Sequence, residues 1–165
     1  MHKAIFLDRD GVINSDEGHY YIYRVEDFKI NEGIIPSMKK FQEAGYLLFV
    51  VTNQGGVAKG IYSEEDVEKV HDYFQAQLKK EGVSLTRIYY CPHHESVAPC
   101  KCRKPSSYFL EQAIENFDID PHQSYMIGDS QRDIAAAEGA GVKGIRIAAN
   151  ENINIYCDQI IQGKI

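Results

Sequence analysis

The sequence predicts an α/β fold: a three-layer, Rossmann-like, mostly parallel sheet with helices on both faces, a zinc-binding loop and no separate cap domain. Two observations lead to this prediction. Short apolar runs alternate with amphipathic stretches along the chain. In addition, a polar cluster follows nearly every apolar run, as expected at the carboxyl ends of parallel strands. The 165 residues suffice for one sizeable core, and we expect residues 1–165 to form a single domain.

The composition excludes several classes of protein. Hydrophobic residues make up 44% and charged residues 25% of the chain, which is typical of a globular protein in water. The net charge of −6, without any run of Lys or Arg, argues against a nucleic-acid-binding surface. The N-terminal apolar run is too short for a signal peptide, and no run approaches the roughly 18 residues of a membrane span. We therefore expect a cytoplasmic protein without nucleic-acid or membrane partners.

The first predicted strand, residues 4–7, leads into Asp8 and Asp10. Residues i and i+2 of an extended chain project to the same side, so the two carboxylates face one space. Gly11 follows and allows a turn or a close approach to the backbone. Turns and calcium loops share the Asp-x-Asp-Gly pattern, but no acid-rich series with a terminal Glu continues here. Two convergent acids suit a divalent cation with an anionic substrate, or a nucleophile with a proton donor.

The alternation continues in the next part of the chain. The Tyr-rich stretch 15–32 is long for a connection, so it is either a functional loop or a packed surface loop. A helix begins near residues 33–36 and stops at Gly45. The buried strand 46–51 follows. It ends in a segment that forms either a turn or a donor-rich anion cradle: Thr52, Asn53, Gln54, Gly55 and Gly56.

Ser63 is the predicted N-cap of the next helix, which ends at Gly82. Its apolar residues follow helical spacing: Val67, Val70, Phe74 and Leu78. His71 lies beside this stripe and is interpreted as a packed or surface histidine rather than a ligand. The third strand covers residues 87–90.

The cysteines indicate a metal site rather than disulfide bonds, because three lie within twelve residues and Cys157 is remote. The three clustered thiols and one histidine match a tetrahedral zinc site: Cys91, His93, Cys100 and Cys102. His94 is the alternative histidine. A metal would make this loop rigid, since the loop has no apolar core of its own. A closed set of four ligands predicts a structural zinc ion, and Cys157 has no assigned role.

Arg103 and Lys104 directly follow the last clustered cysteine, so a rigid loop would hold their side chains in a fixed direction. The alternative is that both side chains are solvated at the surface. After a helix that ends near residue 117, the strand 125–128 leads into Asp129. Asp133 falls one helical turn later and is expected to cap or orient rather than to bind metal.

The C-terminal part is predicted to contain an Ala-rich helix at residues 134–139 and a fifth strand at residues 144–147. The tail beyond residue 148 carries no clear pattern. Its pair Ile160-Ile161 is expected to cover the sheet edge.

The polar clusters are expected to share one site at the carboxyl edge of the sheet, and phosphomonoester hydrolysis explains each of them. A phosphate dianion repels a carboxylate nucleophile, by about 4 kcal/mol per pair of unit charges 4 Å apart at an effective dielectric constant of 20. A Mg²⁺ ion held by Asp8 and Asp129, with Lys104 on the phosphoryl oxygens, would offset this repulsion. Thr52 and Asn53 would donate hydrogen bonds to the same oxygens.

The two acids of the first cluster then have different roles. Asp8, ionised next to the metal, is expected to attack phosphorus and form an aspartyl-phosphate. Asp10, crowded by another carboxylate, is expected to hold a proton for the leaving alcohol and later to activate water.

Four segments in this order resemble the motifs of the haloacid dehalogenase (HAD) superfamily of phosphatases: Asp8-Arg-Asp-Gly-Val12, Thr52-Asn-Gln54, Arg103-Lys-Pro105 and Gly128-Asp129. The Cys- and His-containing loop is similar to that of the zinc-containing branch. The branch includes enzymes that remove the 7-phosphate of D-glycero-D-manno-heptose 1,7-bisphosphate and domains that hydrolyse histidinol phosphate. The resemblance covers about residues 3–147.

The resemblance implies a monomeric, Mg²⁺-dependent phosphatase with a structural Zn²⁺ ion, in which the main-chain carbonyl of Asp10 is a further Mg²⁺ ligand. It favours a sugar bisphosphate as the substrate, in the biosynthesis of nucleotide-activated heptose for lipopolysaccharide. Histidinol phosphate is the alternative substrate, and a catalytically inactive, metal-stabilised binding module is the alternative from another class.

The resemblance also implies residues for substrate binding: Asp16, Glu17, Gly18, His19, Gln54, Gly55 and Arg103. Among these, Arg103 would select the second phosphate. Two places depart from the family pattern: Ser130 stands where a basic residue often follows the last motif, and the stretch Gly18-His-Tyr-Tyr21 also differs. Without a cap domain, the site is expected to be shallow, with substrate selection left to loops.

Overall fold

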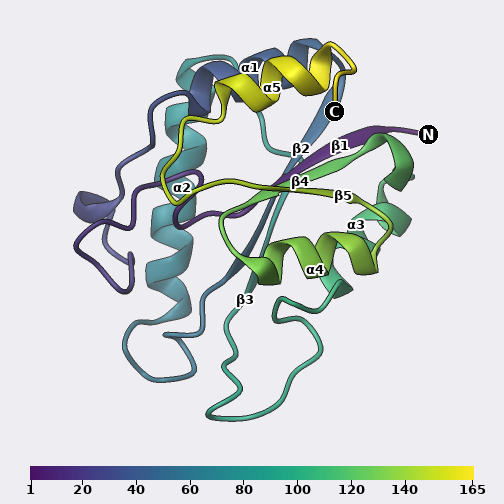
Figure 1. The fold of residues 1–165 in the computed structure, drawn as a ribbon. Coiled ribbons are helices and arrows are strands. Elements are labelled where there is room, and N and C mark those ends of the chain that lie inside the picture. Colours follow the sequence, from purple (N-terminus) through teal and green to yellow (C-terminus); the bar gives the residue numbers. More distant parts are fainter.

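The computed structural model describes residues 1–165 and contains one five-stranded parallel sheet with the strand order β3-β2-β1-β4-β5 (Figure 1). The strands are β1 (Lys3–Leu7), β2 (Tyr46–Asn53), β3 (Arg87–Cys91), β4 (Tyr125–Gly128) and β5 (Lys143–Arg146). The helices are α1 (Ile34–Glu43), α2 (Glu64–Lys80), α3 (Tyr108–Asn116), α4 (Gln131–Gly139) and α5 (Asn154–Ile161). Two short 3₁₀ helices cover Val25–Asp27 and Pro121–Gln123.

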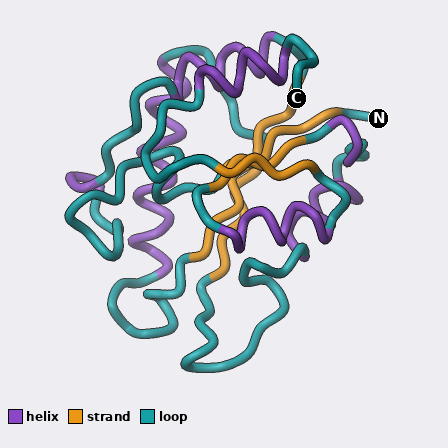
Figure 2. The backbone as a smooth tube through the Cα atoms, in the orientation of Figure 1, coloured by secondary structure: helices purple, strands orange, loops and turns teal.

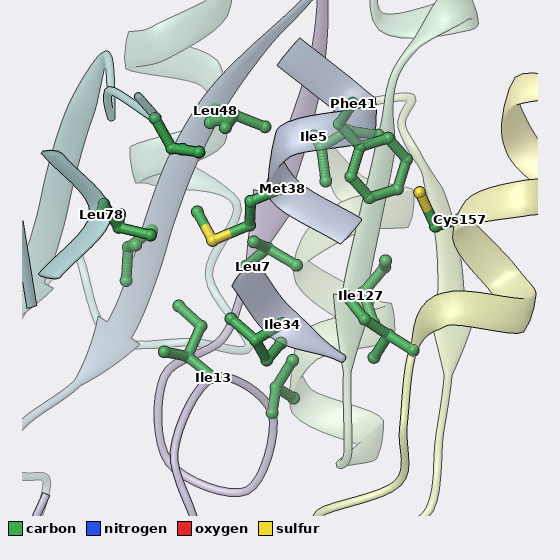
Figure 3. Packing of buried hydrophobic residues seen from close by; sticks show 14 of the residues in the cluster. Ile5, Leu7, Ile13, Ile34, Met38, Phe41, Leu48, Leu78, Ile127 and Cys157 are labelled. Carbon is green, nitrogen blue, oxygen red and sulfur yellow. The ribbon is translucent and has the colours of Figure 1, made fainter. Parts of the chain in front are cut away.

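Alternate residues of β1 point into two separate cores, which makes the molecule three layers thick. Ile5 and Leu7 belong to a cluster of 22 buried residues that includes apolar side chains of α1, α2 and α5 (Figure 3). Ala4 and Phe6 belong to a cluster of 12 that includes side chains of α3 and α4. The predicted three-layer sheet with helices on both faces is therefore confirmed.

The strand order reverses next to β1, where the chain returns from β3 to pair β4 with the other edge of β1. Ligands of open α/β sheets bind at such a switch point, outside the carboxyl ends of the strands. Asp8 directly follows β1 and Asp129 directly follows β4. Figure 2 shows the long loops after β1, β2 and β3, which supply the rest of this region.

Several predicted boundaries are wrong by a few residues. β2 continues through Asn53, because Thr52 and Asn53 pair with Tyr90 and Cys91 of β3. α4 begins at Gln131 rather than at residue 134, since Ser130 and Asp133 form a capping box at its N-terminus. β5 is shifted by one residue from the predicted range 144–147.

Helix α5 was not predicted, and it packs against α1 on one face of the sheet rather than covering a sheet edge. Its residues Cys157 and Ile160 are buried in the larger core, whereas Ile161 is partly exposed. Cys157 thus fills space in the core. None of the helices has both the length and the apolar character that a membrane span needs.

Candidate active site

The structure brings the predicted polar clusters together around one cavity of about 130 Å³ at the carboxyl ends of β1, β2 and β4. Its lining contains no hydrophobic residue and consists of Asp8, Asp10, Thr52, Asn53, Lys104, Ser130, Arg132 and Asp133. An entirely polar cavity of this size fits a phosphoryl group rather than an apolar ligand. The predicted convergence of four distant segments is therefore confirmed.

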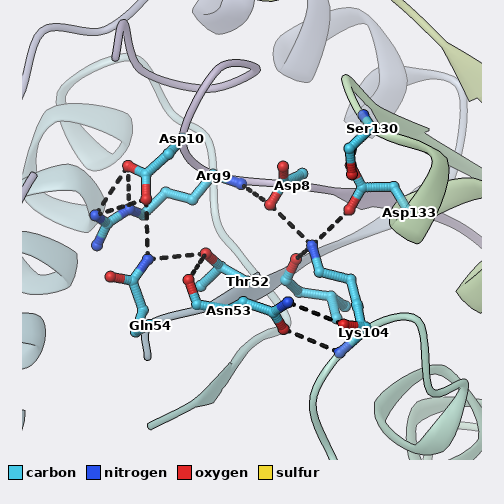
Figure 4. Close-up of polar contacts among 10 residues, drawn as sticks. Asp8, Arg9, Asp10, Thr52, Asn53, Gln54, Lys104, Ser130 and Asp133 are labelled. Carbon is cyan, nitrogen blue, oxygen red and sulfur yellow. Dashed lines mark hydrogen bonds and ion pairs between the residues drawn. The ribbon is translucent and has the colours of Figure 1, made fainter. Parts of the chain in front are cut away.

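Lys104 lies at the centre of the hydrogen-bond network of this cavity (Figure 4). Its Nζ atom donates to Asp8 Oδ1 at 2.8 Å, to Asp133 Oδ1 at 2.7 Å and to the carbonyl oxygen of Val51 at 2.7 Å. Burial alone would lower the pKa of Lys104, but the carboxylates of Asp8 and Asp133 outweigh it and raise the pKa. The side chain is 3% exposed and carries its positive charge into the cavity.

The positive charge of Lys104 does not offset the burial of Asp8 and the negative charges of the acids around it. Burial raises the pKa of Asp8 well above its ordinary value, Lys104 lowers it, and the carboxylates of Asp133 and Asp129 raise it further. The ligand atoms of these three acids lie within 4.8 Å of one another. Oxygen ligands that crowd together at this spacing suit a hard divalent cation such as Mg²⁺.

Asp133 is fully engaged by protein donors, as its predicted orienting role requires. One carboxylate oxygen accepts from Lys104, and the other accepts from the main-chain N–H and the hydroxyl of Ser130, at 3.2 Å each. Asp8 and Asp129 therefore remain as the carboxylate ligands for a metal. Gly11 has a φ of 87°, and a methyl group in its place would overlap the carboxylate of Asp129.

Asp10 is surrounded by hydrogen-bond donors and not by a second acid. Its carboxylate accepts from Arg9 Nε at 3.0 Å, from Asn14 Nδ2 at 2.9 Å and from Gln54 Nε2 at 3.1 Å. In Figure 4 the side chain turns toward Arg9 and Gln54, away from Asp8. The prediction that a neighbouring carboxylate crowds Asp10 is therefore wrong, because three side-chain donors surround its carboxylate instead.

Arg9 is the buried centre of this second network, a role that sequence reasoning missed. Its guanidinium is 1% exposed, bonds Asp10, and donates to the carbonyl oxygen of Ile22 at 2.6 Å. A further N–H group faces His71 Nε2 at 3.3 Å. His71 is buried, as the packed alternative predicted, and it accepts from Arg9. Only the position of Arg9 between the two acids could have indicated this contact.

The neutral state of His71 leads to a prediction about stability. Burial, followed by the nearby charge of Arg9, lowers the pKa of His71 to about 3, whereas an unfolded histidine titrates near pH ~6.5. Between these values only the unfolded chain binds the proton, so His71 destabilises the fold as the pH falls. We expect the wild type to lose about 1.4 kcal/mol of unfolding free energy per pH unit below pH ~6 relative to His71→Gln.

Glutamine keeps an acceptor for Arg9 but does not titrate, which makes His71→Gln a matched substitution. Urea unfolding at several pH values between about 4 and 8 measures the difference. Parallel pH dependences in the two proteins would contradict a buried, neutral His71.

Asn53 holds Lys104 in place through both ends of its side-chain amide. Its Oδ1 accepts from the main-chain N–H of Lys104 at 3.0 Å, and its Nδ2 donates to the carbonyl oxygen of Lys104 at 3.1 Å. Asn53 also lines the phosphoryl cavity, and the second N–H of its amide is not used by Lys104, so the prediction that Asn53 donates to phosphoryl oxygens stays a prediction. Thr52 Oγ1 accepts from Gln54 Nε2 at 2.9 Å, and the Thr52 hydroxyl donates to the carbonyl oxygen of Asn53 at 3.5 Å. The second contact is at the long limit of a hydrogen bond, so a phosphoryl oxygen in the cavity can replace it.

A second cavity, of about 180 Å³, adjoins Asp10 on the side of the loop after β1. Its lining is Asp10, Tyr20, Tyr21, Asn53, Gln54, Gly55, Tyr62, His94 and Arg103. Gln54, Gly55 and Arg103 are thus next to the candidate site, as predicted. The four predicted loop residues are not part of this lining: Asp16, Glu17, Gly18 and His19.

The loop after β1 reaches this cavity with its aromatic residues. Tyr21 packs edge-on against Tyr62, with ring centroids 5.7 Å apart, and Tyr20 is 87% exposed. Asp16 instead accepts from Asn150 Nδ2 at 2.9 Å, so it anchors the loop. The Tyr-rich composition of residues 15–32 was the available signal, and it indicates Tyr20 and Tyr21 rather than their acidic neighbours.

A third cavity, of about 390 Å³, lies against the Cys- and His-containing loop. Its lining is Glu95, Ala98, Pro99, Cys100, Arg103, Lys104, Pro105 and Arg132. Arg132, in the first turn of α4, also lines the phosphoryl cavity, and sequence reasoning missed it. It supplies a cation close to the position where Ser130 departs from the family pattern.

The predicted metal-binding residues of this loop form a tight cluster. The ligand atoms of Cys91, His93, Cys100 and Cys102 lie within 4.8 Å of one another. Three thiols and an imidazole at this spacing fit a tetrahedral metal site. Nδ1 of His94 faces Ser96 instead, with its hydroxyl oxygen at 2.7 Å, so His93 is the histidine of the cluster. Of the two predicted alternatives, His93 and not His94 is therefore placed to bind a metal.

Comparison with known proteins identifies the fold. A family model described as HAD-hydrolase-like matches residues 101–152. The solved structure of D,D-heptose 1,7-bisphosphate phosphatase from B. bronchiseptica, complexed with magnesium and phosphate, superposes with a TM-score of 0.84 at 24% identity. The alignment covers 98% of this chain and 99% of that one, and it shows the same fold. The fold and the converging acids and lysine define a phosphatase of the HAD class.

Curated relatives narrow the class further. The chain is 46% identical to the D-glycero-beta-D-manno-heptose-1,7-bisphosphate 7-phosphatase of Haemophilus ducreyi, over 86% of this chain and 80% of that protein. It is 43% identical to the D-glycero-alpha-D-manno-heptose-1,7-bisphosphate 7-phosphatase of Campylobacter jejuni, over 90% of this chain and 83% of that protein. The chain therefore belongs to the heptose-bisphosphate 7-phosphatase family of HAD-like hydrolases.

Proposed function

We propose that this enzyme removes the 7-phosphate of D-glycero-D-manno-heptose 1,7-bisphosphate, in a Mg²⁺-dependent reaction that passes through an aspartyl-phosphate. The observation that carries the proposal is the contact of Lys104 Nζ with Asp8, inside a polar cavity of about 130 Å³. The cavity accommodates one phosphoryl group, and the adjoining cavities accommodate the remainder of a larger substrate. Relatives named for the beta anomer and for the alpha anomer are 46% and 43% identical to this chain, so both anomers belong in the test.

Asp8 is the proposed nucleophile, and Lys104 and Thr52 stabilise the phosphoryl oxygens. A Mg²⁺ ion held by the carboxylates of Asp8 and Asp129 and the carbonyl oxygen of Asp10 would neutralise charge on the phosphoryl group. Lys104 adds a fixed positive charge, and its three hydrogen bonds hold the ammonium group in place before substrate arrives. Attack by Asp8 then forms the aspartyl-phosphate and expels the sugar oxygen.

Asp10 is the proposed acid and base. The donors Arg9, Asn14 and Gln54 fix the orientation of its carboxylate at the boundary between the phosphoryl cavity and the second cavity. The negative charge of an incoming phosphate favours protonation of this carboxylate. The proton passes to the leaving oxygen, and the ionised Asp10 then removes a proton from the water that hydrolyses the intermediate.

The remainder of the substrate is proposed to lie against Tyr20 and Tyr21, with its second phosphate near Arg103 and Arg132. The two arginines line the 390 Å³ cavity, and Arg132 also lines the phosphoryl cavity. Positive charge at this end suits a bisphosphate. Histidinol phosphate carries an amine at its far end, which would require acids there.

Phosphate release from three substrates tests the proposed specificity. We expect the catalytic efficiency for either anomer of heptose 1,7-bisphosphate to exceed that for histidinol phosphate and for fructose 1,6-bisphosphate by about tenfold or more, since a hydrogen bond to a charged group contributes about 1.5–3 kcal/mol. Each assay is run with and without Mg²⁺. A preference for histidinol phosphate would overturn the substrate assignment and leave the phosphatase class intact.

We also propose that the cluster of Cys91, His93, Cys100 and Cys102 binds a structural Zn²⁺ ion. The cluster lies directly before Arg103 and Lys104, so a metal there would hold the loop that positions both cations. We expect about one zinc ion per chain by elemental analysis. Removal of the ion, by chelation or by Cys102→Ser, is expected to lower both the melting temperature and the activity. Full activity at a zinc content near zero would contradict the proposal.

We retain the expectation of a monomeric, single-domain enzyme that acts on a small metabolite in the cytoplasm. All residues that line the proposed phosphoryl cavity come from this one chain. Sedimentation equilibrium at assay concentrations checks the oligomeric state.

A further inference from the structure

One acidic side chain, Glu95, lies among the cations of the largest cavity. Its carboxylate oxygen Oε2 contacts Arg103 Nε at 2.7 Å, where Glu95 is 61% exposed and Arg103 is 15% exposed. Among the residues that line the 390 Å³ cavity, Glu95 is the single acid, beside the basic residues Arg103, Lys104 and Arg132. In a chain with a net charge of −6, this is a local excess of positive charge.

The neighbouring charges act on Glu95 as they would on a bound anion. Oε2 of Glu95 lies 3.9 Å from His94 Nδ1 as well as 2.7 Å from Arg103 Nε, and Arg132 lines the same cavity. Arg103 is also oriented by a contact of Nη1 with the carbonyl oxygen of His93 at 3.3 Å. A guanidinium group binds carboxylates and phosphates through the same planar set of donors.

We propose that Glu95 occupies the place of the substrate's second phosphate at Arg103 and is displaced when a sugar bisphosphate binds. The inference rests on the proposed function, which places that phosphate near Arg103. An exposed ion pair contributes little stability, so a dianion that meets both Arg103 and Arg132 replaces the carboxylate. Displacing Glu95 lowers the affinity of every ligand that carries the second phosphate. It does not affect a ligand that lacks this phosphate.

Competition between Glu95 and a phosphate for Arg103 also affects how the product is released. Removal of one phosphate leaves a sugar phosphate that still carries the phosphate at the far end, and this product keeps its contact with Arg103. Glu95 returns to Arg103 and weakens product binding, so it favours release. Glu95 is therefore a specificity-determining residue that sets the affinity for both the bisphosphate substrate and the monophosphate product.

Glu95→Gln tests the inference because glutamine keeps the shape and an acceptor but removes the charge. We expect KM for the sugar bisphosphate and the inhibition constant of its 1-phosphate product to fall about threefold to tenfold, as one repulsive charge near a dianion is removed. KM for a sugar monophosphate without the second phosphate stays unchanged. Glu115→Gln, on the exposed end of α3, is the matched control and leaves all three constants unchanged.

The same substitution in an enzyme that already lacks Arg103 tests whether Glu95 acts through Arg103. In an Arg103→Gln enzyme, the additional change Glu95→Gln is expected to have little effect, because the two side chains act through one contact. Equal effects of Glu95→Gln in both backgrounds would overturn the inference. The inference would also be overturned if KM and the inhibition constant were unchanged or raised in Glu95→Gln. Raised values would indicate that Glu95 only positions Arg103.

The same measurements separate this inference from the proposed function. A wild-type enzyme that prefers the bisphosphate but does not respond to Glu95→Gln overturns the role of Glu95 alone. A wild-type enzyme without a preference for the bisphosphate overturns the proposed substrate and the role of Glu95 together. Zinc content is measured for each variant, so that a loosened loop is recognised.

Discussion

Asp8→Asn is expected to abolish phosphate release, with a loss of about 10⁴-fold or more in kcat, as found when a nucleophile is removed from an otherwise intact site. The amide cannot form an acyl phosphate, and it is a poorer ligand for the metal. The loss should appear with every phosphate ester, because the second phosphate and the sugar contact other residues. Steady-state release of inorganic phosphate measures it.

The stability of the same variant separates chemistry from folding. Burial raises the pKa of Asp8, which shows that an ionised group at this position is unfavourable for the metal-free fold. A neutral amide is therefore expected to keep or raise the melting temperature. Asp72→Asn, on the exposed face of α2, is the matched control for both measurements. Activity within tenfold of the wild type in Asp8→Asn would contradict the role of Asp8.

Lys104→Met is expected to reduce both activity and stability, in contrast to Asp8→Asn. The variant leaves Asp8 and Asp133 without the cation that contacts both at 2.8 and 2.7 Å. Removal of one partner from a buried ionic network costs about 3–5 kcal/mol of unfolding free energy. The loss of a preorganised cation at the phosphoryl group lowers kcat by about 10²–10³ as well.

Methionine has a similar length to lysine and no charge, so the substitution isolates the ammonium group. Lys39→Met, at an exposed position of α1, is the matched control. Thermal unfolding and kcat are measured with and without Mg²⁺, and we expect added Mg²⁺ to restore part of the stability because it neutralises Asp8. A Lys104→Met enzyme with wild-type stability would contradict the network around Asp8 and Asp133.

The alternation of strands and helices and the position of the site at the carboxyl edge of the sheet could be predicted because both follow from local patterns. Each buried strand is a short apolar run, and its polar terminus must lie at the carboxyl edge of a parallel sheet. The cluster of three cysteines and one histidine was predicted from the spacing of these residues along the loop. The helix Asn154–Ile161 was missed because its buried face, with Cys157 and Ile160, has too few residues for a clear periodicity.

The prediction of the site failed where contacts depend on distant parts of the chain. Arg9 follows Asp8 in the sequence, yet its role depends on His71 from α2 and on the carbonyl oxygen of Ile22. Asn53 bonds the main chain of Lys104, a contact across 51 positions that spacing cannot reveal. Such partners become visible only when the sheet brings their elements together.

Chemical trapping of the phosphorylated enzyme tests the central claim most directly. Rapid mixing with heptose 1,7-bisphosphate and Mg²⁺, followed by a borohydride quench, reduces an aspartyl-phosphate to homoserine, which mass spectrometry of the N-terminal peptide locates. We predict homoserine at position 8 and unmodified aspartate at position 10. Turnover without any change at position 8, or a modified carboxylate elsewhere in the chain, would contradict the proposal that Asp8 attacks the phosphoryl group.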